Sequence, residues 1–214
     1  DYIVIWRGEL RMKVVHICLA NFYVDGMGYQ ENLLTKFHAE AHDVFILTSD
    51  YAFDAHGNEI RKIEKEYVNE FGIPVKVLER SRRYGWYSKY NDFDNLYSSL
   101  LEINPDVIFC HGGQFIALMD VIKYCKKNKS VKLYIDQHGD YYNTPINTFK
   151  SKLVYQWIYG YWMRKAVPYV DTFWGVTPWR CQYLQEVYKL PKEKIDLLVM
   201  GGDEPLNVLR LCAH

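Results

Sequence analysis

The sequence lacks an apolar run of the roughly 18–20 residues that a membrane-spanning helix needs. Residues 1–11 contain a short apolar patch, but they lack the basic start and the small-residue cleavage site of a signal peptide. Met12-Lys13 is typical of a natural start. We therefore expect residues 1–11 to be an upstream extension of the folded domain.

An excess of charge is also missing, because Lys and Arg number 26 and Asp and Glu number 26. A neutral chain has no global positive field to attract nucleic acid, so we expect no nucleic-acid partner. The five cysteines form no CxxC motif. A scattered, odd-numbered set is typical of reduced thiols, so we expect a cytoplasmic protein without a metal site.

Repeats and low-complexity linkers are absent as well, and short apolar runs alternate with helical patterns instead. The apolar runs predict strands at about 14–19, 44–48, 75–78, 107–110, 133–136, 172–176 and 195–199. The helical patterns lie at about 31–40, 58–70, 91–103, 114–127, 148–166 and 178–188. Apolar strands separated by helices are typical of a parallel sheet covered on both faces. We therefore predict a Rossmann-like, doubly wound α/β fold with a mainly parallel sheet of about seven strands, which binds ligands beyond the carboxyl ends of its strands.

The loop after the first predicted strand carries Gly26 and Gly28, and a helical pattern follows at once. Backbone N–H groups at a helix start bind phosphate, and glycines let the backbone come close to a ligand. Gly26, Gly28 and the neighbouring Tyr29 are therefore our candidates for binding a nucleotide. The dinucleotide fingerprint GxGxxG requires glycine where this chain has Glu31, so an NAD-binding protein is only an alternative. A plain turn without a ligand is another alternative.

His111 and Gly112 follow the predicted strand 107–110. A glycine at the carboxyl end of a strand makes room for a ligand, so both residues are candidates for binding a substrate. A simple turn into the next helix is the alternative.

His138 follows the predicted strand 133–136, and it points the same way as Asp136 if that strand continues. A histidine at such a place can donate to a sugar hydroxyl or a phosphate and can exchange a proton near neutral pH. His138 is therefore our catalytic candidate. Gly139, Asp140 and Tyr141 extend the same loop and are candidates for binding the substrate. The alternative is a loop histidine whose only role is to form hydrogen bonds with neighbouring residues.

Two further segments combine basic and aromatic residues. Segment 80–92 could hold an anionic or sugar-bearing ligand or a membrane surface, with a solvated loop as the alternative. Helix 148–166 carries aromatics along its length and basic residues near its ends. That pattern permits peripheral membrane contact, but the wide spread of apolar residues favours a buried packing helix.

Five segments together resemble the N-terminal half of family 4 glycosyltransferases. They are MKVVHICLANFYVDGMGYQENLLTKF, HDVFILTSD, PDVIFCHGG, LYIDQHGDYYN and VTPWRCQYLQEVYKLPKEKIDLLVMGGDE. The resemblance covers about residues 12–204 and lies in several strand-end loops in the right order. It implies the GT-B architecture, in which two Rossmann-like domains face each other, and it makes residues 12–204 the acceptor-side domain.

The resemblance also implies roles for single residues. Gly26 and Gly28 match the family's glycine-rich loop near the donor diphosphate, and His138 and Gly139 match the histidine-glycine pair near the transferred sugar. The pair Ala41-His42 departs from the family's Gly-His, whose glycine forms a left-handed helix cap, and predicts strain there. The segment before Gly202-Asp203 resembles the family's hinge.

The family implies transfer of a hexose or related sugar from a nucleotide-sugar to a sugar or lipid-linked acceptor, with retention and without a metal or other cofactor. Residues 205–214 do not resemble the start of the donor domain, so we expect that domain to be missing and the chain alone to be nearly inactive. The apolar face left exposed by the missing domain would favour association into a homo-oligomer. An NAD-dependent oxidoreductase or epimerase-type Rossmann domain and a non-catalytic binding module remain the alternatives.

Overall fold

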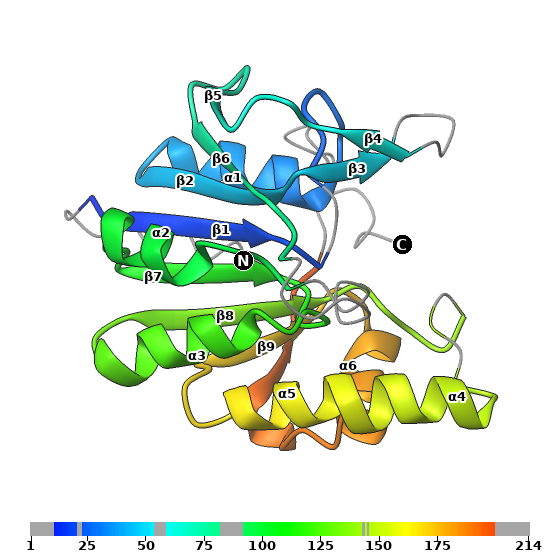
Figure 1. Ribbon diagram of the computed structural model, residues 1–214. Helices are drawn as coiled ribbons and strands as arrows, with labels where there is room; N and C mark the ends of the chain where they lie inside the picture. The colour runs from blue at the N-terminus through cyan, green and yellow to red at the C-terminus, as the bar shows by residue number, and fades with distance from the viewer. Residues whose placement is uncertain are drawn as a thin grey trace, which may run out of the picture.

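A computed structural model of the chain describes residues 11–20, 23–53, 59–81, 92–142, 144 and 146–199. Its main sheet has eight strands in the order β10-β9-β8-β7-β1-β2-β6-β5, and all neighbours are parallel except β5 and β6 (Figure 1). The mainly parallel, doubly wound α/β sheet predicted from the sequence is therefore confirmed, with one strand more than expected.

The strands of the described chain are β1 (Lys13–Cys18), β2 (Asp43–Ser49), β3 (Tyr51–Phe53), β4 (Glu59–Arg61), β5 (Glu66–Val68), β6 (Pro74–Leu78), β7 (Val107–His111), β8 (Lys132–Gln137), β9 (Thr172–Gly175) and β10 (Ile195–Leu197). The helices are α1 (Gln30–Ala39), α2 (Leu96–Ile103), α3 (Leu118–Lys127), α4 (Phe149–Lys152), α5 (Gly160–Ala166) and α6 (Pro178–Glu186). A π-helical segment, Leu153–Tyr159, joins α4 to α5, and a short 3-10 turn, Lys192–Lys194, precedes β10.

Alternate residues of β1 enter two different cores. Val15 and Ile17 belong to the larger apolar cluster, which also contains residues of α2, α3 and α5. Val14 and Cys18 belong to a smaller cluster on the other face. His16 therefore points to the same face as Val14 and Cys18, because side chains alternate along a strand.

The predicted helix at 58–70 is wrong. This stretch instead contains β4, which pairs with β3, and β5, which pairs antiparallel with β6. A turn at Gly72, which has a φ of +75°, joins β5 to β6, and the Asn69 side chain accepts from two backbone N–H groups in it. Ile63 of this stretch is 95% exposed, whereas Tyr67 of β5 packs against the smaller apolar cluster.

The predicted strain at Ala41 is also wrong. Helix α1 ends in a right-handed conformation at Glu40, and Ala41 is not among the residues with positive φ. The His42 N–H closes the last turn on the His38 carbonyl at 2.9 Å, so no left-handed cap is needed.

The helix predicted at 148–166 forms, and Thr148 and Ser151 make a capping box at its start. Trp162, Met163 and Ala166 on one side are buried, as a packing helix requires. Phe149, Trp157 and Tyr161 are exposed, so the expectation of a buried packing helix is only partly right.

Several predictions lie outside the described residues: the extension at 1–10, most of the basic-aromatic segment (82–91), the hinge at Gly202-Asp203 and the tail at 205–214. Four cysteines are described, and all four are free thiols. Among the helices of the described residues, none has the length and apolar character to cross a membrane.

Candidate functional site

The chain order of the sheet reverses at β1, which pairs with β2 on one side and with β7 on the other. Ligands of doubly wound sheets bind at such a switch point, beyond the carboxyl ends of the strands. Gly28 follows β1, His111 ends β7 and His138 follows β8, and these three strands are neighbours in the sheet. The three predicted positions therefore lie at one edge of the sheet, as expected.

The glycine loop before α1 is open. Gly26 has a φ of +74°, which favours glycine, and its N–H donates to the Glu70 carboxylate at 2.9 Å. A Cβ added at Gly28 would meet no atom within 4 Å. Tyr29 is 53% exposed and is the residue before α1, where no side chain caps the helix. The start of α1, where the sequence predicts anion binding, therefore has no side-chain cap, although the Asn32 N–H already donates to the Tyr29 carbonyl at 3.1 Å.

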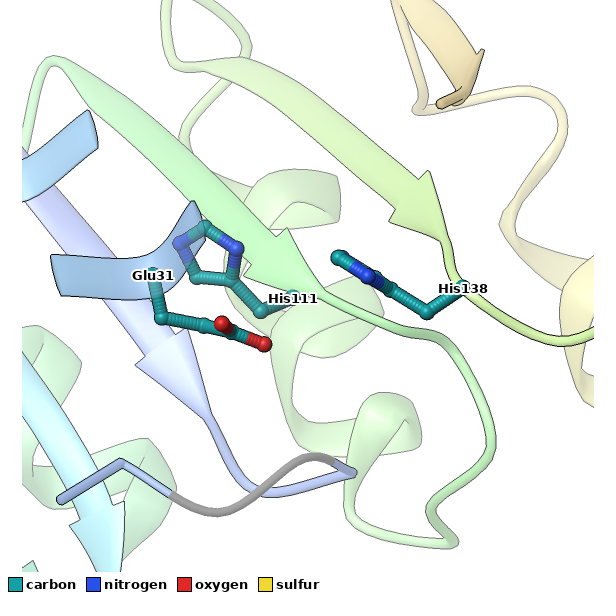
Figure 2. Close-up of side chains that lie close together, drawn as sticks. All are labelled: Glu31, His111 and His138. Carbon is teal, nitrogen blue, oxygen red and sulfur yellow. The ribbon is translucent and has the colours of Figure 1, made fainter. Parts of the chain in front are cut away.

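The buried face of α1 is polar, which is unusual for a helix that covers a sheet. Its buried residues are Gln30, Glu31, Asn32 and Thr35. The side-chain oxygens Gln30 Oε1 and Asn32 Oδ1 are buried and have no hydrogen-bond partner among the described residues. Glu31 reaches from α1 toward His111 and His138 (Figure 2). The helix therefore covers a polar layer beside the smaller apolar cluster, against which its Ala39 packs.

Asp136 is at the centre of this polar layer and is completely buried. Its Oδ2 accepts from His111 Nδ1 at 2.9 Å, and its Oδ1 accepts from the Gly112 N–H at 2.8 Å. His138 Nε2 lies 3.2 Å from Oδ2, at the distance of an ion pair. A buried carboxylate is stable only with such partners, so the loops after β7 and β8 are joined through Asp136.

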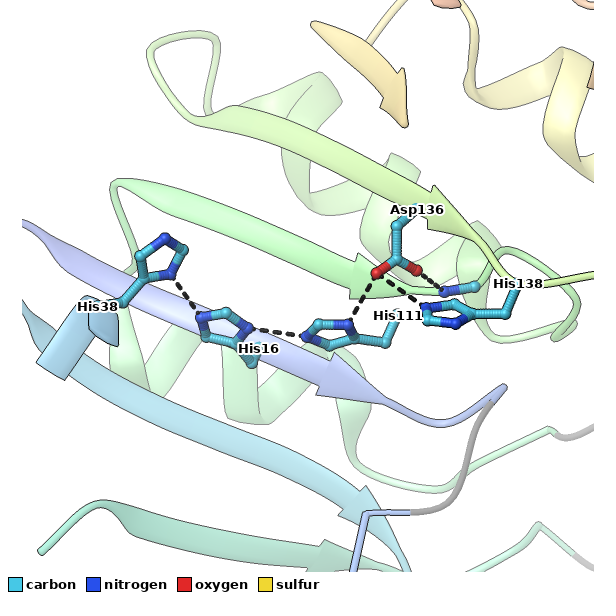
Figure 3. Close-up of polar contacts among 6 residues, drawn as sticks. His16, His38, His111, Asp136 and His138 are labelled. Atoms are coloured by element: carbon cyan, nitrogen blue, oxygen red, sulfur yellow. Dashed lines mark hydrogen bonds and ion pairs between the residues drawn. The ribbon is translucent and has the colours of Figure 1, made fainter. Parts of the chain in front are cut away.

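A row of histidines continues from Asp136 into the interior (Figure 3). His111 Nε2 lies 2.9 Å from His16 Nδ1, and His16 Nε2 lies 2.9 Å from His38 Nδ1. A carboxylate only accepts hydrogen bonds, so His111 donates from Nδ1 and, when the rings are neutral, accepts at Nε2. With neutral rings, each histidine then donates from Nδ1 toward Asp136, and this one choice of tautomer satisfies all three hydrogen bonds.

The pKa values in this row follow from burial and charge. Burial, together with the neighbouring His38 and His111, lowers the pKa of His16 far below its usual value. Burial and His42 lower the pKa of His38 to about 4. Both histidines therefore stay neutral at pH 7.

Asp136 and His138 form a charged pair. Burial would raise the pKa of Asp136, but the charges of His111 and His138 and their hydrogen bonds outweigh it and hold this pKa well below its usual range. Burial would lower the pKa of His138, but Asp136 and then Glu31 outweigh it and raise this pKa above its usual value. A positive charge is thus favoured at the strand end, where the sequence predicts a catalytic histidine.

Two predicted glycines have clear local reasons. Gly112 has a φ of +85°, which turns its N–H onto Asp136. A Cβ at Gly139 would lie 2.6 Å from the Gln137 side chain and 2.9 Å from Thr144 Oγ1. Glycine at these two positions lets the loops after β7 and β8 lie close to Asp136 and His138.

Asp140 and Tyr141 anchor the loop to α6. The Asp140 carboxylate lies 3.5 Å from Arg180 Nε and accepts from the Tyr142 N–H at 2.9 Å. The Tyr141 hydroxyl donates to Glu186 at 2.5 Å, and its ring packs edge-on against Tyr183. Contacts of either residue with a substrate stay predictions.

His111 is fully buried and uses both ring nitrogens within the protein, in its hydrogen bonds with Asp136 and His16. Glu31, His111 and His138 together offer three ligand atoms within 4.8 Å of one another (Figure 2). A metal ion there would have to displace a hydrogen bond of His111. The predicted contact of His111 with an acceptor remains a prediction.

His16 and His38 were not predicted from the sequence, and Glu31 was considered only as a departure from the GxGxxG pattern. The one usable signal was the spacing of Asp136 and His138. His16 lies within an apolar run, and no local pattern there indicates a hydrogen-bond partner.

The fold is similar to those of solved structures at low sequence identity. A sucrose-phosphate synthase from Thermosynechococcus elongatus is 10% identical, with 90% of this chain and 91% of that chain covered and a TM-score of 0.54. A glycosyltransferase from Rickettsia africae ESF-5 is 12% identical, with 89% of this chain and 43% of that chain covered and a TM-score of 0.49. A UDP-GlcNAc 2-epimerase from Neisseria meningitidis bound to UDP-GlcNAc is 15% identical, with 89% and 47% covered and a TM-score of 0.44. Such identities show the fold alone.

The chain spans less than half the length of the Rickettsia and Neisseria proteins. A search of curated proteins found no significant match. The family model for Glycosyltransferase Family 4 matches residues 29–203, which include α1, the buried pair Asp136–His138 and α6. This match extends over most of the chain, and the chain therefore belongs to Glycosyltransferase Family 4.

Proposed function

We propose that this chain forms one wall of the active site of a two-domain glycosyltransferase. The enzyme moves a hexose or related sugar from a nucleotide-sugar donor to a sugar or lipid-linked acceptor, with retention of the anomeric configuration. The observation that carries the proposal is the charged pair of His138 and buried Asp136, 3.2 Å apart, at the sheet edge where the open loop at Gly28 also lies.

The donor diphosphate is bound at the start of α1. Gly28 leaves space for it, and the N–H groups of the first turn have no side-chain cap. The partial positive charge of a helix start stabilises the negative charge that grows on the leaving diphosphate. The opposing domain supplies further basic groups.

His138 binds the transferring sugar or the acceptor. Its raised pKa favours the imidazolium form, whose N–H groups donate to hydroxyl or phosphate oxygens. Asp136 is a positioning residue, because it is fully buried and holds the His138 ring and its charge. The loop at 137–147 shapes the acceptor side.

The test is nucleotide-sugar turnover by a longer form that includes the second domain, with and without His138→Ala. We expect kcat to fall by about 10²-fold, since a hydrogen bond to the reacting group is lost. His42→Gln is the matched control, because His42 lies between α1 and β2 at the opposite edge of the sheet. Equal turnover by the His138→Ala variant would remove His138 from the mechanism.

The chain by itself contributes one wall, so water is not excluded from the diphosphate. We expect weak or no binding of nucleotide-sugars by residues 1–214. Calorimetry with a panel of nucleotide-sugars measures this, and micromolar affinity would contradict it.

A further inference from the structure

Four large apolar side chains form an exposed row on the helix that runs from α4 to α5. Their exposed fractions are 84% for Phe149, 45% for Leu153, 67% for Trp157 and 51% for Tyr161. They recur every four residues, while Trp162 and Met163 of the same helix are buried. Three of the four are aromatic, and we call the four together the aromatic row.

The π-helical segment explains why the row is straight. In an α-helix with 3.6 residues per turn, positions four apart drift by about 40° around the axis at each step. The segment Leu153–Tyr159 has i→i+5 hydrogen bonds and hence more residues per turn. The α and π parts together average close to four residues per turn, so the four side chains lie along one line.

Basic residues accompany the row, and no acidic residue lies within 148–170. Lys150, Lys152 and Lys165 are exposed. Lys165 Nζ lies 5.4 Å from the centre of the Tyr161 ring. Arg164 is not part of this charge, because its guanidinium donates to the Tyr188 carbonyl at 2.8 Å inside the protein. This helix thus combines exposed apolar side chains with exposed lysines and carries no acidic residue.

We propose that the aromatic row and its lysines dock the protein on an anionic lipid bilayer. Trp, Tyr and Phe suit the boundary between headgroups and acyl chains, and lysines are attracted to anionic headgroups. A bilayer fits this surface better than a second copy of the chain, because the lysines beside the row, with no acidic residue within 148–170, would repel their counterparts across a two-fold interface.

The row begins at α4, which lies at the side of the molecule toward which β7 and β8 point (Figure 1). Phe149 follows the His138 loop after a short connection. A bilayer under the row would therefore lie beside the candidate site. This docking does not depend on the proposed sugar transfer, because lipid binding is measured without turnover.

The experiment is vesicle flotation of the 214-residue chain with phosphatidylcholine vesicles and with vesicles that also contain phosphatidylglycerol. We expect the wild type to bind the anionic vesicles. The Phe149→Ala/Trp157→Ala variant should bind them with an affinity at least tenfold lower. Lys150→Gln/Lys152→Gln should weaken binding by about fivefold per lysine, and salt should weaken it further. Phe71→Ala and Lys126→Gln are matched controls, since both side chains are exposed and lie outside the helix.

Circular dichroism establishes that each variant is folded before its binding is compared. Equal binding by the Phe149→Ala/Trp157→Ala variant and the wild type would overturn the proposal, as would failure of the wild type to bind anionic vesicles. Light scattering adds a further arm: a dimer that the same variant dissociates, without vesicle binding, would assign the row to a second copy of the chain instead.

Discussion

His111 Nδ1 donates to Asp136 Oδ2 at 2.9 Å, and both side chains are fully buried. This hydrogen bond connects the polar interior under α1 with the strand-end loop of His138. It orients the carboxylate that faces His138, so the charge at the sheet edge depends on two fully buried side chains.

The Asp136→Asn variant should lower the pKa of His138. In the wild type, Asp136 opposes the effect of burial, and the pKa of His138 lies above its usual value. Without the negative charge, burial is the larger effect, and the pKa should fall below the wild-type value. NMR titration of the histidine Cε1–H signals measures this. Asp140→Asn is the control, because its carboxylate faces Arg180.

The same shift has a consequence for stability. The folded pKa of His138 is raised, so its contribution to the free energy of unfolding is present below about pH 6.5 and is lost as the pH rises through the raised pKa. The Asp136→Asn variant should lack this loss. An unchanged pKa of His138 in the variant would contradict the pairing.

Acid should destabilise the fold through His38 and His16. Their folded pKa values are lowered, that of His38 to about 4, so the unfolded chain binds more protons as the pH falls below about 6.5. Between pH 6.5 and 4, His38 alone should cost about 3 kcal/mol of unfolding free energy. Urea unfolding at several pH values measures this. His38→Gln should show a smaller dependence on pH, and an equal one would exclude His38 as the cause.

Two glycines should differ strongly in how far substitution by alanine lowers the unfolding free energy. A Cβ at Gly175 would lie 2.5 Å from the backbone nitrogen of Cys181, and β9 would have to move away from α6. Gly175→Ala should therefore lower the unfolding free energy by about 2 kcal/mol or more. Gly28→Ala should change it by less than about 0.5 kcal/mol, because the added methyl group meets nothing. Thermal unfolding compares the two, and similar melting temperatures would contradict the packing described for Gly175.

Helix α1 and the strands of the parallel part of the sheet could be predicted because each follows a local pattern. The apolar run at 14–19 and the pattern at 31–40 match β1 and α1 closely. The helix prediction at 58–70 was wrong because residue spacing alone does not show whether an apolar residue packs against the core. Ile63 is almost fully exposed.

The site could be predicted in part. The order of strand-end loops placed Gly28, His111 and His138 at one sheet edge, since the carboxyl ends of parallel neighbours lie together. The exposed side of helix 148–166 could not be predicted from the sequence, because its apolar residues are spread widely around the helix. Only the packing shows which of them are buried.

The sequence by itself determined the alternation of strands and helices, the loops that carry glycine and histidine, and the resemblance to family 4 glycosyltransferases. The tertiary structure alone decided that His16, His38, His111 and Asp136 form one hydrogen-bonded row. These residues are far apart in the chain and lie on β1, α1, β7 and β8. Crossover connections bring them together, and burial then sets their charges, which no local pattern encodes.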